Sequence, residues 1–153
     1  MRTRVGTRRM RRRAFLDLVM PPATRAASDD PDALAASLAL LFGRDLADQS
    51  PIVMQQLGAL RLYDAAARLA QLAGIPTLVL SAGHDVISRP DTGDRLARAI
   101  PGARLVRMED AGHGVTIQRA DRVNALLAEH FAAADAASAG ISSVAPPGGT
   151  GRG

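Results

Sequence analysis

Two side chains capable of acid–base chemistry follow two apolar stretches of the sequence. Asp85 comes directly after the run "TLVLSAGH", and His113 lies between Gly112 and Gly114 in "DAGHGV", 28 residues further along. A carboxylate that accepts a hydrogen bond from one imidazole nitrogen fixes the tautomer of the ring and leaves the other nitrogen free as a base. We therefore expect Asp85 and His113 to form an acid–base pair, with the two glycines letting the loop bring the imidazole close to a substrate.

The segments around this pair alternate between strand and helix patterns. Residues 76–83 are apolar and β-branched between Pro76 and Gly83, which predicts a central parallel strand, and residues 103–110 alternate as a strand nearer a sheet edge does. Helical spacing follows each of them, over residues 90–100 and 120–131. This order predicts an α/β fold with a right-handed crossover and a parallel sheet. Parallel strands end at one edge about 4.8 Å apart, so the loops that carry Asp85 and His113 should meet.

Helical patterns also fill the part of the chain before this α/β segment. An acidic capping cluster at residues 28–32 precedes apolar residues at helical spacing up to residue 41. A second pattern begins at Ser50 and Pro51, which suit a helix start, and Gly74 should end it. Apolar residues recur at helical spacing between them, at Leu62, Ala66, Leu69 and Leu72. We expect one helix in each region.

The composition limits the chemistry that this chain can perform. A length of 153 residues with 47% hydrophobic content is typical of one globular domain, and the sequence contains no cysteine. Disulfide scaffolds, thiolate nucleophiles and cysteine zinc sites are therefore excluded, and a cytoplasmic location is expected. Asp85 and His113 would supply only two metal ligands, so we expect no metal site and no cofactor. His84 should lie beside the pair, and His130 should be exposed on the last helix.

The positive net charge is concentrated at the start of the chain. Residues 1–13 hold seven of the nineteen arginines and no acidic residue, whereas the remainder has 12 arginines against 15 aspartates and glutamates. Aromatic side chains for base stacking make up only 3% of the sequence. We interpret residues 1–13 as a disordered leader and expect no nucleic-acid partner. The alternative, nucleic-acid binding by the leader, predicts salt-sensitive association that disappears when these residues are deleted.

Neither export nor membrane insertion is expected. The segment "RRAFLDL" resembles a twin-arginine signal, but Asp17, Pro21, Pro22 and Arg25 interrupt the apolar region that such a signal needs. No apolar run approaches the roughly 20 residues that span a bilayer. Residues 133–153 are small and rich in glycine and proline, which predicts a disordered tail.

Residues 69–131 resemble the C-terminal part of the α/β-hydrolase family. The resemblance rests on "IPTLVL" followed by an aspartate, then "LARAIPGARLV", then "AGH". It implies that Asp85 is the acid and His113 the general base of a Ser-His-Asp triad, in the last two strand–helix units of a hydrolase sheet. Lactonases, esterases and non-haem haloperoxidases are the members it suggests. On this interpretation residues 14–60 form a helical cap-like segment, and residues 61–132 form the C-terminal core portion.

The nucleophile of such a triad is not evident in this chain. The family carries it in a G-x-S-x-G elbow ahead of the acid, and none of the eight serines has that setting. The nearest serine, Ser81, lies within the predicted strand and is interpreted as a packed residue. We expect a fragment that is inactive alone, from a truncated gene, a mispredicted start or a split enzyme.

Two functions remain open from the sequence. The first is hydrolysis of a small-molecule ester or lactone by the full-length relative, through a Ser-His-Asp mechanism. The alternative is a non-catalytic interaction module, or half of a split hydrolase, that associates with itself or with a partner chain through an exposed sheet. The sequence does not specify the substrate.

Overall fold

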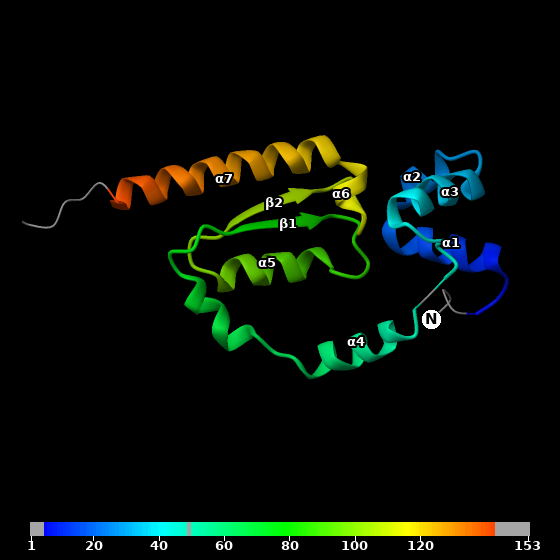
Figure 1. Cartoon of the computed structure of the whole chain (residues 1–153), viewed down its shortest axis with the longest axis horizontal. Helices are drawn as coiled ribbons and strands as arrows, with labels where there is room; N and C mark the ends of the chain where they lie inside the picture. The colour runs from blue at the N-terminus through cyan, green and yellow to red at the C-terminus, as the bar shows by residue number, and fades with distance from the viewer. Residues whose placement is uncertain (1–4, 49, 143–153) are drawn as a thin grey trace, which may run out of the picture. The chain divides into compact units, whose positions relative to one another are not determined.

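The computed structural model describes residues 5–48 and 50–142 of the chain, which form helices and one parallel sheet (Figure 1). The chain divides into two units, Met1–Arg119 and Ala120–Gly153. In chain order the elements are α1 (Arg8–Val19), α2 (Pro22–Ala26), α3 (Pro31–Phe42), α4 (Ile52–Leu62), the 3-10 helix η2 (Ala66–Leu72), β1 (Leu78–Ala82), α5 (Pro90–Ala99), β2 (Arg104–Met108), α6 (Val115–Gln118) and α7 (Ala120–Ser142).

Strands β1 and β2 form a two-stranded parallel sheet within the described residues. Leu78 lies beside Arg104 at one end of the pairing, and Ala82 lies beside Met108 at the other. Helix α5 makes the crossover between the strands, so the predicted strand–helix–strand order is confirmed. Both strands end at the same edge, and the loops that carry Asp85 and His113 leave the sheet there.

Helix α5 packs closely on β1 because one of its residues has no side chain. A Cβ atom added at Gly93 would lie 2.7 Å from the Ser81 Oγ and 2.8 Å from the Ser81 Cβ. Arg107 of β2 forms an ion pair with Asp94 of α5, which joins the second strand to the same helix. The crossover helix is thus held against both strands.

The N-terminal helices share a core of their own. Helix α3 begins where the Asp30 side chain accepts hydrogen bonds from the backbone N–H groups of Asp32 and Ala33, and it ends at Gly43, which has a φ of 63°. Between α1, α3 and the segment after α3 lies a cluster of buried side chains: Leu16, Val19, Met20, Ala35, Leu38 and Leu46. Burial of these apolar side chains stabilises the N-terminal helical segment, which was predicted to be cap-like.

The prediction of a disordered leader over residues 1–13 is wrong for residues 8–13, which lie in α1. Thr7 caps the helix through the Met10 N–H. Arg12 donates to Asp45 Oδ1 at 2.8 Å, and Arg8 reaches the same carboxylate at 2.8 Å. These arginines form ion pairs within the fold, which a count of like charges along the sequence does not show. Residues 1–4 lie outside the described residues.

Two other predicted boundaries are corrected by the structure. The single helix expected from Ser50 to Gly74 is interrupted, since Tyr63 is extended and the Asp64 side chain accepts from the Ala66 N–H at the start of η2. The tail predicted to be disordered over residues 133–153 is helical up to Ser142, the end of α7. Its alanines favour a helix over residues 133–142; residues 143–153 lie outside the description.

None of the helices over the described ranges is long and apolar enough to cross a membrane.

Candidate active site

Asp85 lies in a tight turn directly after β1. The loops after the two strands are joined by backbone hydrogen bonds from Gly83 N to Met108 O and from His84 N to Ala111 O, both 2.9 Å. The Oδ1 atom of Asp85 accepts from the backbone N–H groups of Ile87 and Ser88, both at 2.8 Å. Only 9% of the Asp85 side chain is exposed. One carboxylate oxygen therefore anchors the loop, and the other remains available.

His113 lies in the loop between β2 and α6, where its position in the sequence predicts a contact with Asp85. Its Nδ1 atom is 2.9 Å from Asp85 Oδ2, and 38% of the His113 side chain is exposed. The other ring nitrogen, Nε2, has no hydrogen-bond partner among the described residues. This arrangement orients the imidazole through Nδ1 and leaves Nε2 able to accept a proton.

The His113 loop is held from both sides by residues that the sequence analysis did not single out. Gln118 accepts a hydrogen bond from Gly112 N at 2.8 Å through Oε1, and its Nε2 donates to the Val19 carbonyl at 2.7 Å. Gly114 N donates to the same carbonyl at 2.8 Å. Cβ atoms added at Gly112 or Gly114 would lie 3.0 Å from Val19 O. The end of α1 lies so close that a side chain at either position would have little room. Packing therefore favours glycine at both positions, in addition to the flexibility predicted for the loop.

An ion pair spans the ends of the same loop. Arg119 bonds the carboxylate of Asp110, and this hydrogen bond lowers the pKa of Asp110 while raising that of Arg119. Asp110 lies just after β2 and Arg119 lies just after α6, so this ion pair joins the two ends of the segment that contains His113. No local pattern marks Gln118 or Arg119, because their partners become evident only in the folded loop.

The other candidate side chains do not join the pair. Ser81 is buried in β1, as predicted, and its Oγ has no hydrogen-bond partner among the described atoms. His84 is exposed and lies beside Asp85 along an open hollow. His130, predicted to be exposed, is partly buried in α7, with its ring centroid 5.9 Å from that of Phe131.

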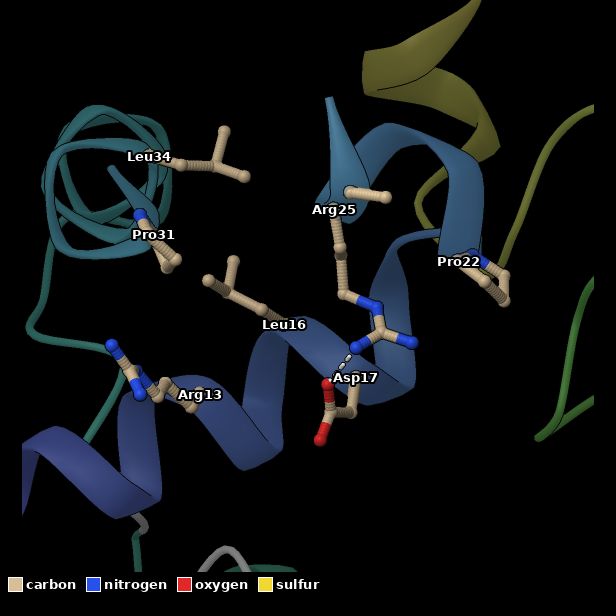
Figure 2. A pocket seen from close by; sticks show the side chains of 8 residues that line it. Arg13, Leu16, Asp17, Pro22, Arg25, Pro31 and Leu34 are labelled. Carbon is tan, nitrogen blue, oxygen red and sulfur yellow. Dashed lines mark hydrogen bonds and ion pairs between the residues drawn. The ribbon is translucent and has the colours of Figure 1, made fainter. Parts of the chain in front are cut away.

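A cavity of about 330 Å³ reaches His113. Its wall is formed by Phe15, Leu18, Val19, Phe42, Ile87, His113, Gly114, Thr116 and Ile117. A separate cavity of about 400 Å³ lies among the N-terminal helices and contains neither Asp85 nor His113 (Figure 2). Arg13 lines that second cavity together with the ion pair between Asp17 and Arg25, so it is the more charged of the two.

Comparison with known proteins identifies the family. A model of the hydrolase family described as "TAP-like protein" matches residues 62–142, slightly more than half of the chain and the part that holds both strands, Asp85 and His113. The chain belongs to the α/β-hydrolase family. The predicted fold class, a C-terminal portion of this fold with its last strand–helix units, is confirmed.

Individual relatives match over different lengths. The chain is 34% identical over 123 residues to "Polyketide synthase ThaQ" of Burkholderia thailandensis, which covers 78% of this chain and 6% of that protein. It is 35% identical over 81 residues to "Putative carbamate hydrolase RutD" of Klebsiella pneumoniae strain 342, which covers 53% of this chain and 30% of that protein.

A solved structure supports the same fold. The crystal structure of "Putative non-heme bromoperoxidase BpoC" from Mycobacterium tuberculosis H37Rv superposes with a TM-score of 0.70 at 23% identity. The superposition covers 85% of this chain and 47% of the BpoC chain. This hydrolase-family chain thus spans less than half the length of each of these relatives.

Proposed function

We propose that Asp85 and His113 are the acid and the general base of a Ser-His-Asp hydrolase that acts on an ester or a lactone. The observation that carries this proposal is the 2.9 Å contact between His113 Nδ1 and Asp85 Oδ2, with Nε2 left free. Membership of the α/β-hydrolase family supports it, because that fold presents its triad acid and histidine on such loops.

The roles follow from the geometry of the pair. His113 Nε2 takes the proton from a serine hydroxyl as the serine oxygen attacks the acyl carbon and the carbonyl π electrons move to the oxygen. The imidazolium is stabilised by Asp85 and gives the proton to the leaving alkoxide oxygen as the C–O bond breaks. A water molecule then attacks the acyl-serine, and His113 again accepts and returns a proton.

The serine for this mechanism has to come from outside these 153 residues. None of the serines in the sequence lies in a G-x-S-x-G elbow, and Ser81 is buried in β1. We therefore expect the 153-residue chain to be inactive by itself. An oxyanion hole would also have to be supplied, and the loss of one donor of such a hole costs on the order of 10²–10³ in rate.

Labelling and complementation test this proposal. The purified chain should remain unlabelled by a fluorophosphonate probe and should not hydrolyse p-nitrophenyl butyrate. Joined to a hydrolase segment that carries the G-x-S-x-G elbow, it should gain esterase activity. His113→Ala should then abolish that activity, Asp85→Asn should lower it on the order of 10⁴-fold, and the matched control His130→Ala should leave it unchanged. Full activity of His113→Ala would refute the assigned role.

A second candidate function, association with a partner chain as half of a split hydrolase or as an interaction module, is favoured by the exposure of α4. This helix has no buried residue, and Leu60 and Leu62 are 65% and 91% exposed. Leu105 of β2 is also exposed, at 36%. Light scattering should show self-association that Leu62→Asp weakens; a monomer at all concentrations would exclude self-association.

We propose a cytoplasmic location for this chain. The support is a sequence without cysteine, which fits a reducing compartment. Fractionation of the source cells should recover the protein with cytoplasmic enzymes, and recovery in the culture medium would contradict the proposal.

A further inference from the structure

Among the described residues, no arginine, aspartate or glutamate lines the cavity that reaches His113, and His113 is the titratable side chain in its wall. Aliphatic and aromatic side chains from α1, α3 and α6 make up most of it, together with Ile87 from the turn after Asp85. By contrast, the cavity among α1, α2 and α3 is lined by Arg13, Arg25 and Asp17 (Figure 2). The apolar cavity at His113 and the charged cavity among these helices therefore suit different kinds of ligand.

Large apolar side chains at the first cavity are only partly covered by protein. Phe42 is 40% exposed, Ile87 is 53% exposed and Leu18 is 36% exposed. The Phe15 and Phe42 rings meet edge to face, with centroids 5.5 Å apart, and so form a firm aromatic wall. A ligand that covered these side chains would remove apolar surface from water, which favours its binding.

The hydrogen bonds that hold the His113–Asp85 pair also hold this apolar wall. Asp85 Oδ1 accepts from Ile87 N at 2.8 Å, so the turn that anchors the carboxylate also carries Ile87. Gly114 N donates to the carbonyl of Val19, which itself lines the cavity. A group bound in the cavity is thereby placed against the residue that would act as the base.

We infer that this cavity binds the uncharged apolar acyl or alkyl group of the substrate, and that the substrate is a short-chain neutral ester or lactone. The inference rests on the proposed function and adds its substrate class. A volume of about 330 Å³ is at the small end of ligand pockets, which span roughly 300–1,000 Å³. An anionic substrate such as a carboxylate is disfavoured, because an apolar wall does not replace the water that a charge loses on binding.

Binding of methyl butanoate and butanoate to the full chain, followed by amide and methyl NMR, tests the inference without requiring catalysis. Methyl butanoate should shift the signals of Ile87, Gly114 and Ile117, and butanoate should bind at least about tenfold more weakly at this site. Equal or tighter binding of butanoate would overturn the inference, as would ester-induced shifts confined to Arg13 and Arg25.

Two neighbouring residues of α3 provide a matched pair of variants. Phe42→Asp places a carboxylate in the cavity wall and should weaken binding of methyl butanoate at least about tenfold. Leu41→Asp adds the same charge one residue away, at a side chain that is 68% exposed and does not line the cavity, and should change binding less than twofold. Both lie at the end of one helix, so the helix dipole affects them alike. Equal binding by the two variants would also overturn the inference.

The Asp85→Asn variant separates this inference from the proposed function. Asp85 does not line the apolar cavity, and the amide oxygen of the asparagine can still accept from the Ile87 and Ser88 N–H groups. Binding of methyl butanoate should therefore be retained while the complemented hydrolase loses its activity. Retained binding without any hydrolysis in the complemented wild-type protein would contradict the proposed function alone. Hydrolysis of p-nitrophenyl butyrate that is equal in Phe42→Asp and wild type would contradict only the assignment of the cavity.

Discussion

The backbone N–H of Gly114 donates to the carbonyl of Val19 at 2.8 Å and joins the His113 loop to the last residue of α1. This bond brings the helical N-terminal segment against the loop that carries the general-base candidate. Gln118 donates to the same carbonyl at 2.7 Å, so two elements of the α/β segment converge on one atom of α1. The position of His113 therefore depends on residues far from it in the sequence.

Gly112→Val should displace the His113 loop. A Cβ at this position would lie 3.0 Å from both Val19 O and Pro21 N, and the larger side chain has no room to turn away from that backbone. We expect a loss of about 1–3 kcal/mol in the free energy of unfolding. The Nδ1 proton resonance of His113, which reports the hydrogen bond to Asp85, should be lost or broadened. An unchanged resonance would contradict the contact between Gly112 and Val19.

Gln118→Leu should destabilise the same loop for a different reason. The leucine leaves the buried Gly112 N–H without its acceptor and removes one donor from Val19 O. Leaving such groups unsatisfied costs about 1–3 kcal/mol, measurable by urea denaturation. Gln56→Leu, at an exposed position of α4, is the control and should change stability by less than about 0.5 kcal/mol. Equal effects of the two substitutions would refute the bridging role.

Gly93→Ala should destabilise the protein, although the same change usually stabilises a helix. The new Cβ would lie 2.7 Å from Ser81 Oγ and 2.8 Å from Ser81 Cβ, within the packed contact of α5 on β1. Gly58→Ala in α4 is the matched control, because no atom lies within 4 Å of its added Cβ. We expect the control to raise the unfolding free energy by about 0.5–1 kcal/mol and Gly93→Ala to lower it by about 1–3 kcal/mol. Thermal melts of both variants should show these opposite changes in stability.

Acid should weaken the ion pairs between α1 and the segment after α3. Hydrogen bonds from Arg12, then from the Ala47 N–H and from Arg8, hold the pKa of Asp45 well below its usual range. Because the folded pKa is depressed, this stabilisation is complete above the ordinary carboxyl pKa of about 4 and declines as the pH falls below it. The effect should be modest and salt-sensitive, since half of the Arg8 side chain is exposed.

Thermal melts between pH 2 and pH 6 measure this dependence. Asp45→Asn should be less stable than the wild type at pH 6, and the difference should narrow towards pH 2 because the unfolded wild-type chain takes up a proton on Asp45 before the folded protein does. A difference that stays constant over the whole range would show that the charge of Asp45 contributes nothing.

The Asp85–His113 contact could be predicted because both residues follow strands of one parallel sheet. Strand-type runs, a helical spacing between them and the turn residues Pro90 and Gly102 are local features of the sequence. Parallel strands end at one edge, so residues at those ends meet whatever lies elsewhere in the chain. Such local patterns were sufficient to predict the α/β order and the contact between Asp85 and His113.

Local sequence patterns did not predict the contacts in which a charged side chain or a backbone carbonyl has a partner far away along the chain. Arg8 and Arg12 belong to a run of like charges in the sequence, but in the structure they bond Asp45, more than 30 positions away. Gln118 bonds Val19 at a separation of 99 residues. Contacts of this kind leave no periodicity to detect. The chemistry of the pair follows from residue types and spacing, whereas folding alone creates the apolar cavity beside His113, because its wall combines side chains of segments that are separate in the chain.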